Sequence, residues 1–162
     1  MGFDTVVASI ISIALIISVA YLFASGSFAL VDMASTEYKK AVDKAVEIMN
    51  TKLSVLSVSY DNTTNTVVAD IKNSGMTRFS DFSRFDVFVY GKPDGSSETY
   101  YADIKSVVFD IVAELSNPGI FDPHEIVRIN VELAQALPNG TYVLVVCAPN
   151  GVCCSGEFTV GG

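Results

Sequence analysis

Residues 5–31 form a run of 27 positions without a charged side chain, between Asp4 and Asp32. As an α-helix this run is about 40 Å long at 1.5 Å per residue, whereas the hydrocarbon core of a bilayer is roughly 30 Å thick. Apolar residues surround the whole helix, which is typical of a helix in lipid or in a bundle. The alternative, a central helix of a soluble domain, rarely needs so long an uncharged run. The segment therefore predicts a membrane helix.

The first four residues contain no Lys or Arg. A cleaved secretory signal has a basic start, a shorter apolar core and a small-residue cleavage site, so we expect the apolar segment to be retained. The basic residues give a conflicting indication of topology. Lys39, Lys40 and Lys44 follow the segment, and counting them would place the C-terminal part in the cytoplasm. They alternate with acidic residues, which weakens that indication.

Composition excludes two classes of protein. Half of the residues are hydrophobic and 17% are charged, whereas a disordered chain has low hydrophobicity and a high density of charge. The formal net charge is −8, and a nucleic-acid-binding protein needs a basic surface, so we expect no nucleic-acid partner. Apart from Asp4, all of the charge lies beyond residue 31.

Helical periodicity continues beyond the apolar segment. Between residues 32 and 52 apolar side chains recur at steps of three and four, and charged residues fill the other positions. The stripe consists of Tyr38, Ala41, Val42, Ala45, Val46, Met49 and Leu53. We expect one helix of about 50 residues, whose second half packs on a domain or on a neighbouring helix. The expected divisions are an apolar helix at 1–34, an amphipathic extension at 35–52 and a β domain at 53–162.

From residue 53 onward the hydrophobic period changes to two, which is typical of strands. Segments 55–60 and 67–72 flank a polar turn and predict a hairpin. Further strands are expected at 85–90, 100–103, 107–113, 126–133, 141–147 and 156–160. Residues 143–146 are apolar on both faces, which indicates a strand at the centre of a sheet. The expected fold class is α+β, a long N-terminal hydrophobic α-helix followed by an all-β immunoglobulin-like sandwich.

The sequence contains few residues that suggest catalysis. His124 is the only histidine and lies in a Pro-bounded turn, where we expect it to be exposed. Nucleophile-elbow, dinucleotide-binding, P-loop and zinc-protease motifs are all missing. Carboxylates occur singly along strands and loops, which indicates a solvated acidic surface. The oxygen-rich residues 61–65 lack the ligand spacing of a calcium loop and predict a plain turn. We therefore expect no enzyme activity, no cofactor and no metal.

Cys147, Cys153 and Cys154 surround the turn residues 149–151. A three-residue hairpin with Gly in the left-handed region places Cys147 opposite Cys153, whereas a two-residue turn places it opposite Cys154. Either pair suits a cross-strand disulfide in an oxidising compartment. Reduced structural cysteines and a metal site are the alternatives, although three thiols without a nearby His form an incomplete zinc set.

Asn62 and Asn139 each begin an N-x-[ST] triplet in an expected loop. Both are candidate N-glycosylation sites, because a glycan is tolerated on an exposed loop. Such triplets also arise by chance. Together with the cysteine hairpin, they fit a domain outside the cytoplasm.

The start Met1-Gly2-Phe3-Asp4, the long apolar helix, its amphipathic extension and the C-terminal sandwich together resemble the archaellum F proteins of archaea. The segment 67–75, which ends in Asn73-Ser74-Gly75, is similar to a strand and turn of the archaellin and type IV pilin-like superfamily. The resemblance covers the whole chain in architecture. It implies a single-pass protein of the archaeal cell membrane, with a sandwich between that membrane and the S-layer.

The resemblance further implies a structural role in motility, in which the sandwich binds the S-layer protein and anchors the stationary part of the archaellum motor. The implied partners are the S-layer protein, the archaellum G protein and archaellins, and we also expect a homo-oligomer. The alternative is a filament-forming archaellin or pilin subunit, in an extracellular filament whose core contains the packed N-terminal helices. Such subunits are cut after a short basic leader, which residues 1–4 do not resemble.

Overall fold

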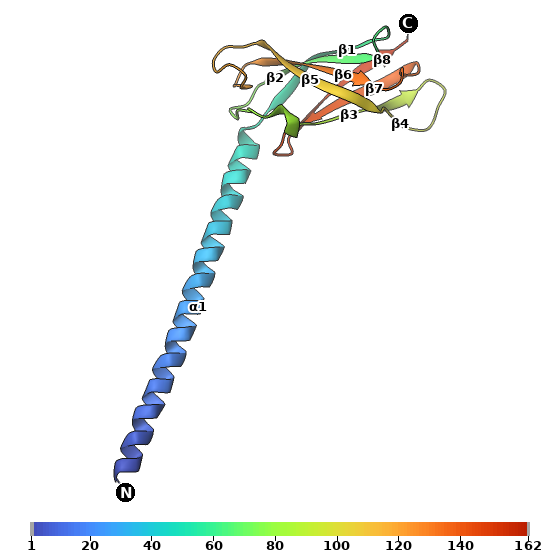
Figure 1. Ribbon diagram of the computed structural model, residues 1–162. Coiled ribbons are helices and arrows are strands. Elements are labelled where there is room, and N and C mark those ends of the chain that lie inside the picture. Colours follow the sequence, from blue (N-terminus) through green and yellow to red (C-terminus); the bar gives the residue numbers. More distant parts are fainter. Residues whose placement is uncertain (1, 162) are drawn as a thin grey trace. The chain divides into compact units, whose positions relative to one another are not determined.

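The computed structural model describes residues 2–161. Helix α1 (Gly2–Asn50) contains 49 residues and runs from the apolar segment through most of the expected extension (Figure 1). Leu53, which the helical spacing included in the apolar stripe, is instead the first residue of the first strand and lies in the core. The chain divides into two compact units, Met1–Lys44 and Ala45–Gly162, so the end of α1 belongs to the same unit as the strands.

Eight strands follow the helix, in the order that the alternating pattern predicts. They are β1 (Leu53–Asp61), β2 (Thr66–Asn73), β3 (Asp86–Pro93), β4 (Tyr100–Tyr101), β5 (Ile104–Ala113), β6 (Ile126–Leu133), β7 (Gly140–Cys147) and β8 (Cys153–Val160). A single 3₁₀ turn, η1 (Phe82–Arg84), precedes β3. All the pairings between these strands are antiparallel.

The strands form two four-stranded sheets, in the orders β1-β2-β6-β5 and β4-β3-β7-β8 (Figure 1). This is the strand order of an immunoglobulin sandwich, with β4 as one additional edge strand. Tyr142, at the start of β7, is fully buried, and its hydroxyl donates to Pro138 O at 3.0 Å. A tyrosine that bonds back across this corner is a hallmark of the immunoglobulin fold. The expected α+β class, a long N-terminal helix followed by a β-sandwich, is confirmed.

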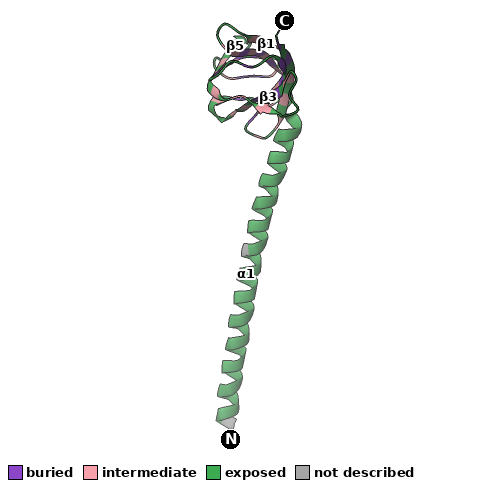
Figure 2. Cartoon of the chain, turned by 90° about the vertical axis from the view of Figure 1, so that its right-hand side faces the viewer, coloured by how far each residue is buried: buried purple, intermediate pink, exposed green. Residues whose placement is uncertain are grey.

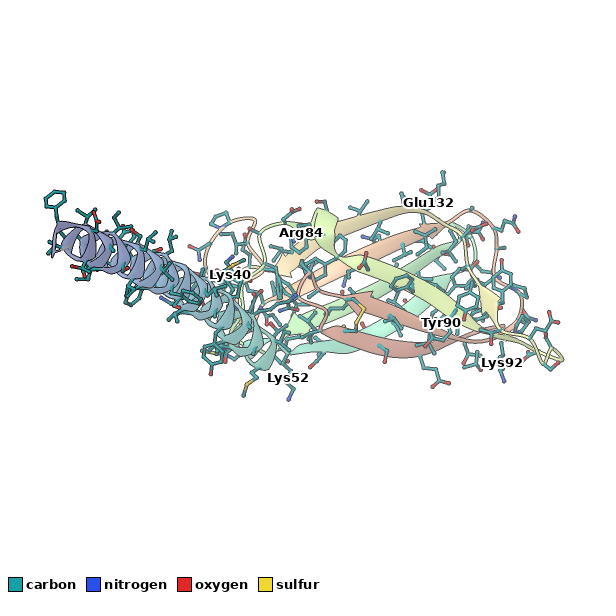
Figure 3. The ribbon with its side chains drawn as sticks, turned by 90° about the horizontal axis from the view of Figure 1, so that it is seen from below. Lys40, Lys52, Arg84, Tyr90, Lys92 and Glu132 are labelled. Atoms are coloured by element: carbon teal, nitrogen blue, oxygen red, sulfur yellow. A yellow bond between two sulfur atoms is a disulfide. The ribbon has the colours of Figure 1, made fainter. Side chains whose placement is uncertain are left out.

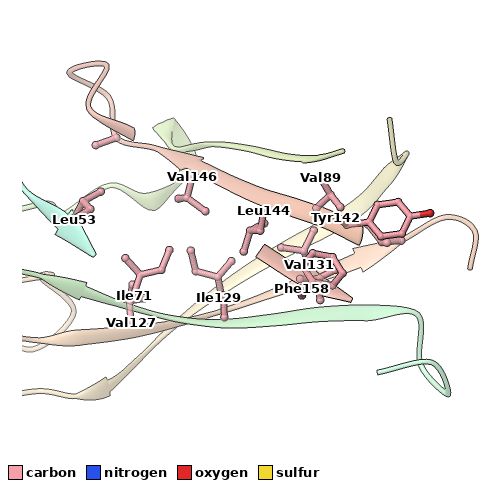
Figure 4. Packing of buried hydrophobic residues seen from close by; sticks show 14 of the residues in the cluster. Leu53, Ile71, Val89, Val127, Ile129, Val131, Tyr142, Leu144, Val146 and Phe158 are labelled. Atoms are coloured by element: carbon pink, nitrogen blue, oxygen red, sulfur yellow. The ribbon is translucent and has the colours of Figure 1, made fainter. Parts of the chain in front are cut away.

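The core lies between the inner faces of the two sheets (Figure 4). Every second residue of the strands points inward, as the alternation predicts, and Ile71, Ile129 and Leu144 are among the fully buried side chains. Each such side chain stabilises the fold by about 1.5–3 kcal/mol relative to exposure. Strand β7 lies between β3 and β8, which confirms the expectation that residues 143–146 belong to an inner strand.

The loops gather at two ends of the sandwich. The strand registers place loops 73–86, 113–126 and 147–153 at the end where β1 begins, next to the last turn of α1. We call this the junction end. Loops 61–66, 93–100 and 133–140 lie at the opposite end, the far end.

Candidate functional site

The apolar half of α1 is exposed along its length (Figure 2). By length and composition, α1 is suited to cross a membrane. Several serines interrupt the apolar run, and each hydroxyl donates to a backbone carbonyl three or four residues earlier. They are Ser9, Ser12, Ser18, Ser25 and Ser27. Because these hydroxyls are satisfied within the helix, the segment is compatible with lipid or with other apolar helices.

The amphipathic extension also carries exposed apolar side chains. Tyr38 and Met49 expose 74% and 84% of their surface. On the polar side, Lys40 Nζ lies 2.8 Å from Glu37 Oε1 in an ion pair one turn apart. The apolar stripe is therefore available to a neighbouring helix.

The Asn-x-Gly turn at 73–75 holds the end of α1. Asn73 is fully buried, and its Oδ1 accepts the Gly75 N–H at 3.1 Å. The next residue, Met76, donates its N–H to the helix-end carbonyl Asn50 O at 2.7 Å. A Cβ at position 75 would lie 2.4 Å from Asn50 O and from Lys52 N, so only glycine fits this approach. The motif that carries the family resemblance is therefore the joint between helix and sandwich.

Two threonines complete this joint. Thr77 Oγ1 donates to Glu47 O at 3.3 Å, and Thr51 Oγ1 lies 2.8 Å from both Glu47 O and Thr77 Oγ1. Asn150, in the cysteine hairpin, donates to Thr51 Oγ1 at 2.7 Å. The last turn of α1 carries no basic side chain, and the two threonine hydroxyls donate to its carbonyl Glu47 O instead.

Two carboxylates at the junction end are buried, which corrects the expectation of a wholly solvated acidic surface. Glu125 is fully buried, and its carboxylate accepts three backbone N–H groups, from Leu115, Ser116 and Asp122, at 2.7–3.1 Å. The sequence gives no period or motif that distinguishes such a loop carboxylate from an exposed one. The bonds hold loop 113–126 closed, which is a structural role.

Asp122 is the second buried carboxylate at the junction end, with 3% of its surface exposed. Its Oδ2 accepts the Asn117 N–H at 3.1 Å and the Asn117 side-chain amide at 2.7 Å, and its Oδ1 lies 3.0 Å from Arg78 Nε. The backbone hydrogen bond from Asn117 is the largest cause that lowers the pKa of Asp122 below the usual aspartate value, and the charge of Arg78 acts in the same direction.

No catalytic arrangement surrounds His124. Its side chain is exposed in the turn, its φ is 72°, and its N–H donates to Asn73 O at 2.8 Å. Among residues 2–161, no group of three or more His, Cys, Asp or Glu side chains is arranged to hold a metal. Asn62 and Asn139 are both exposed, in two of the three far-end loops, 61–66 and 133–140. Nothing in these positions indicates an enzyme.

The cysteine hairpin has the three-residue turn that places Cys147 opposite Cys153. Gly151 has a φ of 87°, as this turn requires. The Cα atoms of Cys147 and Cys153 lie 4.0 Å apart, and their sulfur atoms lie 2.08 Å apart. Cys154 is a free thiol on the inner side of β8, where burial raises its pKa to about 11. A thiol in such surroundings is chemically inert at neutral pH.

The outer faces of the two sheets differ in chemistry. On the outer face of β1-β2-β6-β5, Arg128 forms a bidentate ion pair with Asp70, with N···O distances of 2.8 and 3.0 Å. Lys105 forms an ion pair with Glu132 on the same face. The hydrogen bond from Arg128 lowers the pKa of Asp70. The outer face of β4-β3-β7-β8 instead carries Phe88, Tyr90, Tyr101, Val143 and Val145. We call this second surface the aromatic face.

Strand β5 is a free edge of its sheet, because β6 is its only partner in that sheet. Beside it, a pocket of about 470 Å³ is lined by Phe82, Phe85 and Phe109, together with Ser83, Val107 and Val108. The rings of Phe82 and Phe109 stack with their centroids 5.1 Å apart. An open edge beside an aromatic pocket is the kind of surface to which an extended segment of another protein adds as a strand.

Comparison with known proteins identifies the family. The family model for archaeal-type flagellin matches residues 2–158, which is almost the whole chain. The chain belongs to the archaeal-type flagellin family. An uncharacterized protein of Archaeoglobus fulgidus is 48% identical over 160 residues, which are 99% of this chain and 98% of that protein. Membership of an archaeal flagellin family confirms the resemblance to the archaellin-like superfamily.

Two solved structures also resemble this flagellin-family chain, at low TM-scores. The archaellum periplasmic stator protein FlaG from Sulfolobus acidocaldarius has a TM-score of 0.47 at 24% identity, over 67% of this chain and 99% of its own. A chain in the periplasmic stator complex of FlaF and FlaG from the same organism has a TM-score of 0.46 at 24% identity, over 65% of this chain and 87% of its own.

Proposed function

We propose that this flagellin-family chain is a membrane-anchored structural component of the archaellum. The observation that carries the proposal is the uncharged run at residues 5–31, which forms one exposed helix in the same chain as a β-sandwich. Such a run is long enough to cross a bilayer. The helix serves as a tether, and the sandwich is the part that meets other proteins.

The proposed location of the sandwich is outside the cytoplasmic membrane, between that membrane and the S-layer. The exposed positions of Asn62 and Asn139 in far-end loops support this side, because glycans are added to accessible loops. The proximity of Cys147 and Cys153 supports it as well, since disulfides persist in oxidising compartments. We accordingly propose a disulfide between these cysteines and glycans at both asparagines. The lysines after the apolar segment indicate the opposite topology, in which the sandwich lies in the cytoplasm.

The proposed partners of the sandwich are the S-layer protein and other archaellum components, among them the archaellum G protein and archaellins. Binding them would hold the stationary part of the motor. The free β5 edge and its aromatic pocket are the surface we propose for the S-layer protein, because backbone groups and a pocket are both open there.

The test is retention of purified S-layer protein by the full-length chain, immobilised in detergent micelles. A matched variant is Val107→Pro, which removes a backbone N–H that faces away from β6 at the free β5 edge, and its fold is checked by circular dichroism. The proposal expects retention by the natural chain and at least tenfold weaker retention by a folded variant. Equal retention by the two chains would exclude the β5 edge, and absence of retention by the natural chain would exclude S-layer binding.

The alternative is a filament subunit of the archaellin or pilin type. The family match favours it, because a flagellin-type helix that is apolar on every side also suits the core of a filament. Electron microscopy of sheared surface filaments, with mass spectrometry of their subunits, separates the two functions. If this chain is the main filament component, the anchored role is wrong.

A further inference from the structure

The cysteine hairpin, residues 147–153, connects the end of β7 to the start of β8. Its turn is closed by a hydrogen bond from the Gly151 N–H to Ala148 O at 2.8 Å. The proposed disulfide between Cys147 and Cys153 links the two strands at the base of the hairpin, and it is the yellow bond in Figure 3. A cross-link at the base fixes both ends of a short loop, so it also restricts the residues at the tip.

The tip of this hairpin contacts the end of α1 through one side chain. The Asn150 amide donates to Thr51 Oγ1 at 2.7 Å, and its Oδ1 accepts the Val152 N–H at 3.2 Å. One end of the amide is therefore bonded inside the hairpin and the other end outside it. Within residues 2–161, no other recorded hydrogen bond joins the hairpin to residues 45–52.

The contacted threonine belongs to the joint at the end of α1. Thr51 is 7% exposed, and its hydroxyl lies 2.8 Å from both Glu47 O and Thr77 Oγ1. The residue before Thr77, Met76, donates its N–H to Asn50 O at 2.7 Å. Hydrogen bonds that share a group in this way support one another. A side chain that fixes the Thr51 hydroxyl therefore stabilises the bonds that hold the helix end.

The disulfide is open to thiols in solution but not to the third cysteine. Cys153 is exposed and Cys147 is half-buried, so a dissolved thiol can reach the bond. Successive side chains of a strand point to opposite faces, and Cys154 packs against the core, away from the bridge. Burial also raises the pKa of the Cys154 thiol to about 11, so this thiol stays protonated at neutral pH. The bridge therefore follows the redox state of its compartment.

We propose that the cysteine hairpin is a redox-dependent clasp on the end of α1, which closes when the sandwich reaches an oxidising compartment. On closing, the two thiols of Cys147 and Cys153 lose two electrons and two protons and form the S–S bond. A disulfide-bearing oxidant of the compartment takes these up by thiol–disulfide exchange and becomes a dithiol. In the oxidised chain the tip holds Asn150 against Thr51, whereas in the reduced chain this hydrogen bond opens more often.

Hydrogen exchange at the Met76 amide, in the full-length chain in detergent, measures how often the joint opens. Because the clasp contributes one hydrogen bond, we expect exchange at Met76 to be about fivefold faster after reduction with dithiothreitol. The Cys147→Ser/Cys153→Ser variant should show the same rate without the reductant. The Leu133 amide, which donates to Asn65 O at the far end, is the internal control and should keep its rate.

A second variant tests the route through Asn150. In Asn150→Ala the hairpin loses its bond to Thr51, so Met76 should exchange faster even with the disulfide formed. Dithiothreitol should then change the rate by less than about twofold, because the two changes remove the same contact. Cys154→Ser leaves the bridge and the clasp in place and is the matched control, with the full response to dithiothreitol.

Three results would overturn the proposal. Equal exchange at Met76 in the oxidised and the reduced natural chain excludes the clasp. A full response to dithiothreitol in Asn150→Ala excludes the route through that side chain. Equal acceleration at Met76 and Leu133 shows that the disulfide stabilises the sandwich as a whole instead. The clasp rests on the proposed location outside the cytoplasm, but that location and S-layer retention are measured separately, so both can hold while the clasp fails.

Discussion

Glu125 is a fully enclosed carboxylate that accepts three backbone N–H groups rather than meeting solvent. Buried carboxylates are costly unless their oxygens are hydrogen-bonded, and here the bonded amides belong to a loop without regular structure. At the scale of single residues, the junction end is therefore organised by a few polar side chains. Asn73 and Asp122 act in the same way on the adjoining loops.

Replacement of Glu125 by Ala should be severely destabilising. The change leaves three N–H groups at the junction end without their acceptor, and we expect a loss of about 3 kcal/mol or more in the free energy of unfolding. Guanidinium chloride unfolding, followed by the near-ultraviolet signal of the buried Tyr142, measures it. Glu114→Ala removes a single exposed bond to the Gly119 N–H and serves as the control, with an expected loss below about 1 kcal/mol. Equal effects of the two changes would contradict the role given to Glu125.

The depressed pKa values of Asp122 and Asp70 predict a dependence of stability on pH. A carboxyl whose pKa is lower in the folded chain adds stability above its unfolded pKa of about 4, and loses it as the pH falls through the folded value. The pKa of Asp122 is lowered first by the Asn117 N–H, and that of Asp70 by Arg128. Melting temperatures should therefore fall steeply below about pH 4. In Asp122→Asn the fall should be shallower, and an unchanged slope would refute this assignment.

At the scale of elements, the uncharged run predicts the first half of the helix, and the periods of the sequence predict its second half and all eight strands. They do so because a 3.6-residue stripe and a two-residue alternation reflect which side of each element is buried. The aromatic face was not predicted. Phe88, Tyr90, Val143 and Val145 give their strands apolar residues on both faces, and that pattern is the same whether the outer side is covered by protein or exposed. The buried carboxylates lie in a loop whose sequence has no period that would reveal their burial, because contacts within the loop alone position them.

The joint between α1 and the sandwich makes a prediction for Gly75. A methyl group there would lie 2.4 Å from Asn50 O, so Gly75→Ala must displace either the helix end or the turn. We expect the free energy of unfolding of the sandwich unit to fall by about 1–3 kcal/mol. Gly26→Ala, with no atom within 4 Å of the added methyl, is the control and should be neutral. Hydrogen exchange at the Met76 amide locates the effect, and unchanged protection there would show that the joint tolerates a side chain.

At the scale of the whole molecule, the chain combines an apolar rod-like element with a sandwich that has its own core. The sandwich shows two outer faces of different chemistry and an aromatic pocket beside the β5 edge, where an envelope partner can bind. Membership of the archaeal-type flagellin family associates this chain with the archaellum. Every functional proposal for the sandwich depends on two points: the helix must anchor it to the membrane, and the sandwich must lie outside the cytoplasm.

Protease protection in intact cells, combined with membrane fractionation, tests that placement most directly. The account predicts that the full-length chain sediments with membranes, resists extraction by high salt or alkaline carbonate, and is released by detergent. It also predicts that protease added outside the cell envelope, once the S-layer is loosened, digests the sandwich while cytoplasmic markers stay intact. A chain that remains in the soluble fraction without detergent, or a sandwich digested only after cell lysis, would contradict the central claim.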